Sequence, residues 1–336
     1  MPDNADKGAR KRIHILATGG TIAGVGERGQ TQGYTPGVLS VGKLVEGLPD
    51  VDTIAKVSGE QFLSLNSDDI TQGNWLDILR RIQALVDEDA CDGFVITHGT
   101  DTLEESAYFF HLTVKTSAPV VMTGAMRPAT ATSADGPLNL LQSISLAASD
   151  EARGHGVLVA FNEGVYSARD VRKGNSFRTH AITGGDMGSL GLMRDETPIF
   201  YHKSLKKHTL ETEFDVCGRK CLPAVGVASF HVDARPEILD YLAGTHDGLI
   251  IEGAGDGQVS LAWEKCIRRL AGQGYPIVRA TRVPDGAVFR GAGMPDDEMG
   301  TVAAGTLSPE KARVLLMLAL TKTRDIGKIQ RMFERY

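Results

Sequence analysis

Residues 13–21 read Ile-His-Ile-Leu-Ala-Thr-Gly-Gly-Thr, and residues 94–102 read Phe-Val-Ile-Thr-His-Gly-Thr-Asp-Thr. Each stretch predicts a buried β-strand that glycine stops, with hydroxyl groups just beyond the strand end. In open α/β sheets, ligand chemistry collects at the carboxyl ends of strands. Two such loops that carry threonine, one of them followed directly by Asp101, indicate a hydrolase with a threonine nucleophile.

Strand and helix signals alternate along the rest of the chain. Further strands are predicted at 120–123, 156–161, 225–230, 248–251 and 277–283, with helical stretches between them. This alternation is typical of a largely parallel sheet with helices on both faces. We therefore expect an α/β protein with a large N-terminal α/β domain, whose sheet is mostly parallel, and a smaller C-terminal α/β domain with a parallel sheet.

The domain limits follow from the length of the chain and from a break in this pattern. A chain of 336 residues is long for a single hydrophobic core. From about Lys203 to Leu222 the sequence is polar and no apolar period continues. We expect an N-terminal domain over 1–203, a linker over 204–222 and a C-terminal domain over 223–336.

The sequence also marks where helices begin. Ser67 opens an apolar series at helical spacing, and Thr102 with Glu105 forms a capping-box pattern. The last helix is predicted to begin at Ser308, followed by Pro309.

Composition and charge argue against several classes of protein. The chain is 42% hydrophobic and 23% charged, with a net charge of −6, so we expect no nucleic-acid partner. No window approaches the roughly 18 apolar residues that a membrane span needs, so we expect no membrane partner.

Residues 1–12 are polar and lack the apolar core of a secretion signal. We expect a cytoplasmic protein, or a periplasmic one if a signal peptide has been removed.

The four cysteines are too few and too scattered for a disulfide framework. They are Cys91, Cys217, Cys221 and Cys266. No second Cys/His pair lies near Cys217 and Cys221 at ligand spacing, so we expect no metal and no cofactor. His98 and His155 are expected to be structural, because neither has a partner at metal or catalytic-triad spacing.

Five short motifs run in order along nearly the whole chain. They read Ala-Thr-Gly-Gly-Thr-Ile-Ala-Gly at 17–24, Ile-Thr-His-Gly-Thr-Asp-Thr at 96–102, Gly-Ala-Met-Arg-Pro at 124–128, Ser-Ala-Asp-Gly-Pro at 133–137 and Ala-Gly-Thr-Leu-Ser-Pro-Glu-Lys-Ala-Arg at 304–313. With these motifs the chain resembles the bacterial L-asparaginase family, in particular its type II branch. The resemblance implies hydrolysis of L-asparagine to L-aspartate and ammonia through a threonine acyl-enzyme, and leaves L-glutamine open as a second substrate. It also implies a homotetramer, a dimer of dimers, whose C-terminal domains contribute to neighbouring active sites.

By this resemblance, five residues are expected to carry the reaction. Thr21 attacks the amide carbon, and Tyr34, in the glycine-rich loop 24–37, is its nearest activator. Thr100, Asp101 and Lys173 form a second cluster that moves a proton. Such helpers are needed because an unassisted threonine hydroxyl is a weak nucleophile at neutral pH. The length and glycine content of loop 24–37 predict an active-site lid.

Other residues are expected to hold the substrate. Asp101 binds the ammonium group, while Ser67 and nearby backbone amides hold the carboxylate. Backbone N–H groups near Thr100 serve as oxyanion donors, and the Ala125 carbonyl accepts from the leaving amide. The remaining predicted contacts are Gly20, Asp68, Thr100 and Gln258.

The chain departs from the type II pattern at three positions. Asp68 stands where those enzymes usually carry glutamine. The glutamate and asparagine that a neighbouring subunit lends in that branch fall here at Gly293 and Gln258. Our hypothesis is that Asp68 replaces the missing glutamate, so that the second carboxylate for the ammonium comes from the same chain.

The sequence is also compatible with other functions. The glycines after the first strand mimic a dinucleotide-binding loop, which favours a nucleotide-dependent oxidoreductase, although no tyrosine has a lysine four residues on. A glutaminase-preferring amidase and a non-catalytic amino-acid-binding homologue are further alternatives. Tyr34 is alternatively a surface anchor, Lys173 a solvated charge and Asp68 a helix-start carboxylate without a ligand.

Overall fold

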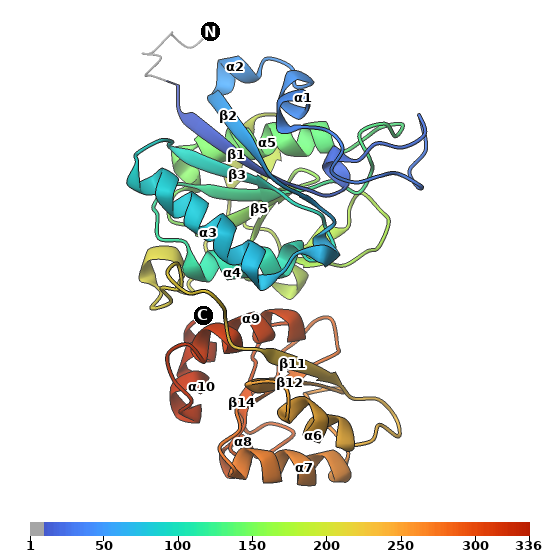
Figure 1. Ribbon diagram of the computed structural model, residues 1–336, viewed down its shortest axis with the longest axis vertical. Coiled ribbons are helices and arrows are strands. Elements are labelled where there is room, and N and C mark those ends of the chain that lie inside the picture. The colour runs from blue at the N-terminus through green and yellow to red at the C-terminus, as the bar shows by residue number, and fades with distance from the viewer. Residues whose placement is uncertain (1–9) are drawn as a thin grey trace. The chain divides into compact units, whose positions relative to one another are not determined.

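The computed structural model describes residues 10–336, and the chain divides into two compact units (Figure 1). The division falls between Glu211 and Thr212, inside the predicted linker segment 204–222. Residues 1–9, which open the predicted N-terminal domain and make up most of the polar start of the chain, lie outside the described residues.

The N-terminal unit is built on an eight-stranded sheet. The strand order is β10 (Thr197–Phe200), β9 (Gly191–Arg194), β6 (Gly164–Ser167), β5 (Val157–Phe161), β4 (Val120–Thr123), β3 (Gly93–Thr97), β1 (Arg12–Gly19) and β2 (Lys56–Leu65). The strands from β5 to β2 pair in parallel, whereas β5, β6, β9 and β10 pair with one another in antiparallel fashion. The sheet is therefore mostly parallel, as predicted.

Helices cover both faces of this sheet (Figure 1). On one face, α5 (Gly136–Ala148) packs on β3, β4 and β5 and shares a buried cluster with Ile13, Ile15 and Val121. The short helices α1 (Val41–Glu46) and α2 (Val51–Ile54) add apolar residues to the same cluster. The helices α3 (Gln72–Asp87) and α4 (Leu103–Thr113) lie on the other face. Burial on both faces explains why the central strands appear in the sequence as continuous apolar runs.

One predicted helix start, at Ser67, is wrong, whereas α4 begins at Leu103 with Thr102 as its N-cap, as predicted. Ser67 begins only a 3₁₀ turn, η2 (Ser67–Asp69), and α3 begins after Thr71, whose side chain forms a reciprocal capping box with Asn74. The Thr102 hydroxyl makes no capping hydrogen bond, because it donates instead to the Ser67 carbonyl at 2.6 Å. That long-range bond ties the turn at Ser67 to the start of α4.

The C-terminal unit holds a four-stranded sheet of order β11 (Val225–Ser229), β12 (Gly248–Gly253), β13 (Ile277–Thr281) and β14 (Val302–Ala303), paired in parallel throughout. The helices α6 (Glu237–Ala243) and α7 (Leu261–Gly272) supply Leu239, Trp263 and Ile267 to its core cluster. The short helix α8 (Asp296–Met299) packs against α7. The parallel pairing agrees with the predicted fold class.

The chain end carries one more helix than predicted. The helix α9 (Pro309–Ala319) begins as expected, with Ser308 as N-cap and Pro309 in its first turn. It is not the last helix, because α10 (Ile326–Arg335) follows, with Asp325 as its cap. Within residues 10–336, no helix is long and apolar enough to cross a membrane.

Candidate active site

Three predicted site segments leave the same edge of the N-terminal sheet. In the pairing register, Thr97 of β3 lies level with Ala17 of β1 and with Thr123 of β4. The loops that begin just beyond these positions carry Thr21, Thr100 and Ala125. Because the three strands are adjacent and parallel, their carboxyl ends meet, as ligand sites in open α/β sheets require.

Glycines allow these loops to touch. A Cβ atom on Gly20 would lie 2.5 Å from the nitrogen of Gly99, and one on Gly99 would lie 2.8 Å from Ser67 Oγ. A Cβ on Gly124 would lie 2.5 Å from the carbonyl oxygen of His98. Gly20 also has a φ of 77°, in the left-handed region that glycine adopts without strain. The glycines that mark the strand ends in the sequence therefore bring the site loops into backbone contact.

Thr21 and Tyr34 form the first polar pair. Their hydroxyl oxygens are 2.7 Å apart, and both residues are half-buried. The ring of Tyr34 packs where a side chain on Gly24 would otherwise be, because a Cβ there would lie 2.8 Å from Tyr34 Cδ2. Two backbone hydrogen bonds between Val25 and Thr35 close the intervening loop. The loop thus holds a phenol against the hydroxyl of Thr21.

Thr100, Asp101 and Lys173 form the second polar group. Lys173 Nζ donates to Thr100 Oγ1 at 2.8 Å and contacts Asp101 Oδ1 at 2.5 Å. Lys173 lies on β7 (Arg172–Lys173), which pairs with β8 (Ile182–Thr183). The Thr100 side chain is buried, whereas two thirds of the Asp101 side chain is exposed. Lys173 therefore links the buried hydroxyl of Thr100 to the exposed carboxylate of Asp101, which a ligand can reach.

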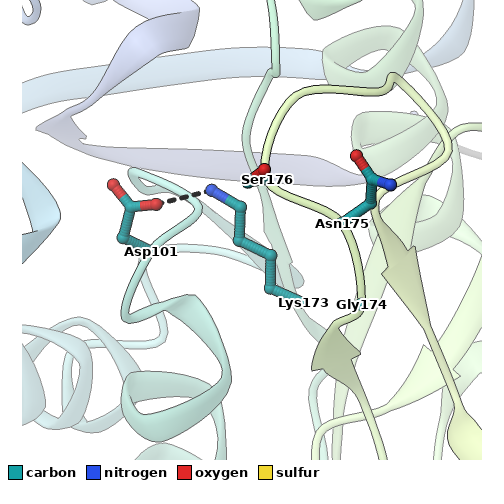
Figure 2. A pocket seen from close by; sticks show the side chains of 5 residues that line it. All are labelled: Asp101, Lys173, Gly174, Asn175 and Ser176. Carbon is teal, nitrogen blue, oxygen red and sulfur yellow. Dashed lines mark hydrogen bonds and ion pairs between the residues drawn. The ribbon is translucent and has the colours of Figure 1, made fainter.

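A pocket of about 260 Å³ lies beside this ion pair, lined by Asp101, Lys173, Gly174, Asn175 and Ser176 (Figure 2). Asn175 and Ser176 are site residues that the sequence analysis missed. The signal was present, because a glycine followed by asparagine and serine directly after Lys173 is typical of a turn. Their amide and hydroxyl groups add hydrogen-bonding capacity to the pocket wall.

Ser67 joins the same loops, and Asp68 stands beside it. Asp101 donates its backbone N–H to Ser67 Oγ at 3.2 Å, and Ser67 is buried. Asp68 is exposed on the 3₁₀ turn, and its carboxylate has no hydrogen-bond partner within residues 10–336. The turn therefore presents an unpaired carboxylate on the residue that follows Ser67, whose hydroxyl accepts the Asp101 N–H.

Three backbone groups at this edge are also unused. The N–H groups of Thr21 and Thr100 have no acceptor, and the Ala125 carbonyl has no donor, among the described part of the chain. Buried backbone polar groups are almost always paired in native proteins. Two free donors and one free acceptor at one sheet edge are what a bound amide group requires.

Gln258 is not among the residues that the N-terminal unit brings together. It is exposed in the C-terminal unit, where Ala254 and Gln258 form an isolated bridge. A Cβ on Gly293 would lie 3.2 Å from Gln258 Nε2. The two positions that depart from the type II pattern in this unit are thus neighbours.

His98 has a structural environment. Its ring is fully buried, with Nδ1 2.7 Å from the Gly99 carbonyl and Nε2 3.0 Å from Ser106 Oγ. Burial lowers the pKa of His98 to about 4, against a weaker raising effect of the Gly99 bond, so the ring is neutral at pH 7. His155 is buried and stacks on Phe200.

Among residues 10–336, no group of three His, Cys, Asp or Glu side chains could hold a metal ion.

Comparison with known proteins gives the family. Residues 12–206 match the model for the N-terminal domain of asparaginase, and residues 224–333 match the model for the glutaminase/asparaginase C-terminal domain. A protein of Haemophilus influenzae named probable L-asparaginase periplasmic is 43% identical over 96% of this chain and 93% of its own length. A glutaminase-asparaginase of Acinetobacter glutaminasificans is 40% identical over 97% of this chain and 100% of its own.

A solved structure agrees with these matches. The crystal structure of a probable cytoplasmic L-asparaginase from Campylobacter jejuni aligns with a TM-score of 0.94 at 39% identity, covering 97% of this chain and 100% of that one. The fold and the residues at the sheet edge define a two-unit α/β amidohydrolase. The chain belongs to the asparaginase family. This confirms the predicted resemblance and removes the dinucleotide-dependent oxidoreductase as an alternative.

Proposed function

We propose that this protein hydrolyses L-asparagine to L-aspartate and ammonia through an ester on Thr21. The observation that carries the proposal is the 2.7 Å contact between the hydroxyls of Thr21 and Tyr34, beside the group of Thr100, Lys173 and Asp101. A threonine nucleophile needs a partner that takes its proton, and Tyr34 is within hydrogen-bond reach. Family membership supports the same activity.

In the first half-reaction, Thr21 Oγ bonds to the side-chain amide carbon as its proton passes to Tyr34 Oη, which releases its own phenolic proton toward the departing nitrogen. Negative charge develops on the amide oxygen, where the free N–H groups of Thr21 and Thr100 can donate. The C–N bond then breaks and the nitrogen departs as ammonia, having gained one proton. Lys173 and Thr100, 2.8 Å apart, supply a route for that proton.

In the second half-reaction, water attacks the ester carbon. The water loses one proton, the C–O bond to Thr21 breaks, and Thr21 regains its hydroxyl hydrogen. L-Aspartate leaves with a carboxylate in place of the amide. The proton of the new carboxyl group goes to ammonia, so the sum is one amide and one water converted to one carboxylate and one ammonium ion.

The substrate is held by complementary charges. Asp101, exposed and beside the pocket, binds the ammonium group, and Asp68 supplies the second carboxylate for that group. Ser67 and backbone N–H groups bind the substrate carboxylate. Gly20 has no side chain, so its backbone can lie close to the loop at Gly99 and to the substrate. L-Glutamine is a second candidate substrate, because a relative 40% identical to this chain is named glutaminase-asparaginase.

The proposal includes an assembly and a compartment. We propose a homotetramer, a dimer of dimers, in which the C-terminal domain (residues 223–336) lends Gln258 to a neighbouring site. Native mass in solution and the KM of Gln258→Ala test this assembly.

Relatives are named both periplasmic and cytoplasmic. We propose the cytoplasm, which cell fractionation tests.

The decisive experiment measures ammonia release from L-asparagine and L-glutamine, with kcat/KM for each. Thr21→Ala and Thr100→Ala should remain folded and lose activity by roughly 10²-fold or more. Thr53→Ala, an exposed threonine outside the site, is the control. Mass spectrometry of enzyme trapped during turnover should find an aspartyl ester on Thr21. A non-catalytic amino-acid-binding homologue would bind the amino acid and release no ammonia.

A further inference from the structure

The loop that follows β4 is held by one carboxylate. Asp135 Oδ2 accepts the backbone N–H of Met126 at 2.9 Å, and Oδ1 accepts that of Arg127 at 2.9 Å. A third donor, Asn139 Nδ2, lies 3.3 Å from Oδ2 and also donates to the Gly124 carbonyl at 3.0 Å. Asp135 immediately precedes α5, whose rigid packing against the sheet fixes its position.

The bond to Met126 also fixes the Ala125 carbonyl. The peptide between Ala125 and Met126 is planar and trans, so its N–H and its C=O point in opposite directions. With the N–H held by Asp135, the carbonyl oxygen points away from that carboxylate. Ala125 is 1% exposed, yet its carbonyl has no donor within residues 10–336.

This peptide lies between the two threonine segments. A Cβ on Gly124 would lie 3.2 Å from Thr100 Cγ2. On the other side, a Cβ on Gly136 would lie 2.9 Å from Ile22 Cγ1 and 3.4 Å from Ala125 Cβ. Ile22 directly follows Thr21. The Ala125 residue therefore lies close to the segments that carry both threonines, where the proposed reaction releases its nitrogen.

We propose that Asp135 is a positioning residue for the leaving group, acting through the Ala125 carbonyl. The inference rests on the proposed function, in which that carbonyl accepts an N–H of the amide. As the C–N bond breaks, the nitrogen gains a proton and its N–H groups become stronger donors. A negative charge at the N–H end of the Ala125–Met126 peptide makes the carbonyl a stronger acceptor, because linked hydrogen bonds polarise one another.

The test compares two substrates that differ only in the leaving group. The leaving group of L-asparagine is a nitrogen that carries N–H donors. The leaving group of L-aspartic acid β-methyl ester is a methoxy oxygen, which carries no hydrogen. Both form the same ester on Thr21, and kcat/KM reports that step for each. Asp135→Asn keeps the side-chain shape and removes the charge. We expect kcat/KM for asparagine to fall about tenfold, while that for the ester changes less than about twofold.

The ratio of the two values does not depend on the fraction of active protein, so partial unfolding does not mimic the effect. Asp135→Glu keeps the charge and should restore most of the ratio, and Asp135→Ser replaces Asp135→Asn if that variant does not fold. The matched control is Asp92→Asn, since Asp92 accepts the Arg12 N–H at 2.7 Å at the start of β1, away from the site.

An unchanged ratio in a folded, active Asp135 variant overturns the inference and leaves the proposed function intact. An equal fall for both substrates also overturns it, because it assigns Asp135 a purely structural role. A wild-type protein that releases no ammonia from asparagine or glutamine overturns the proposed function, and this inference with it.

Discussion

Gly20 and Gly99 lie in backbone contact, so close that a Cβ atom on Gly20 would be 2.5 Å from the Gly99 nitrogen. This contact joins the loop that carries Thr21 to the loop that carries Thr100. The two threonines are 79 positions apart in the chain, and this glycine pair brings their loops together.

Gly20→Ala should therefore separate the two loops. We expect kcat/KM to fall by about 10²-fold, the scale that follows from displacing reacting groups by about 1 Å. The control is Gly274→Ala, because Gly274 has a similar φ of 80° with no atom near the added Cβ. Equal activity losses in the two variants would show that backbone strain alone causes the effect. Steady-state kinetics and thermal unfolding of both proteins make the comparison.

Tyr34→Phe should lower kcat by about 10²-fold without a large loss of stability. The change removes the hydroxyl that contacts Thr21 and keeps the ring that packs against Gly24. Tyr201→Phe, at an exposed tyrosine, is the control. Near-native turnover in Tyr34→Phe would leave Tyr34 as a packing residue only.

Asp68→Asn should raise KM for asparagine far more than it lowers kcat, because the carboxylate is proposed to bind the ammonium group and to take no part in bond breaking. Asp69→Asn changes the next residue of the same exposed turn and should leave KM unchanged. If both variants bind as well as the wild type, the second carboxylate for the substrate must come from elsewhere.

The C-terminal unit should depend on one buried ion pair. Arg279 and Asp296 are fully buried and joined by two hydrogen bonds of 2.6 Å. Burial by itself raises the pKa of the Asp296 carboxyl, but hydrogen bonds from Arg279, the Gly291 N–H and Thr301 outweigh it, and the pKa is lowered. Asp296→Asn leaves a buried guanidinium without its counterion, so we expect a loss of about 3–5 kcal/mol in the free energy of unfolding at pH 7.

The sign of the pH dependence follows from the lowered pKa. The contribution of Asp296 is fully present above the ordinary carboxyl pKa of about 4 and is lost as the pH falls through the lower folded value. Denaturant unfolding at pH 7 and at pH 3 should show a smaller difference between wild type and Asp296→Asn at the acid pH. Asp297→Asn, at an exposed neighbour that pairs with Arg290, is the control and should change stability little. A difference that grows on acidification would contradict the assignment.

Most of the fold could be predicted because its signals are local. Apolar runs mark β1, β3, β4, β5 and the first three strands of the C-terminal sheet, and glycines mark the ends of β1, β3, β4 and β12. The start of α9 was predictable because Ser308 and Pro309 act within one helical turn. In contrast, β14 has only two residues, too few to show a periodic pattern.

The helix α4 begins where it was predicted, but its predicted capping box does not form, for a different reason. Thr102 and Glu105 have the spacing of a capping box, but the Thr102 hydroxyl donates to the carbonyl of Ser67, 35 residues away. A local pattern predicts a local bond only when no distant group competes for the same hydroxyl. Since Ser67 is brought there by packing, its position could not be inferred from the residues around Thr102.

The sequence alone determined which strands form, which residue types follow them and which family the chain resembles, because short-range propensity and ordered motifs act within a few residues. Only the tertiary structure decided that Lys173 reaches Thr100 across 73 positions and that Asp135 turns the Ala125 carbonyl away from itself. These relationships depend on how parallel strands and their crossover helices pack, and that packing is set by long-range burial of apolar surface.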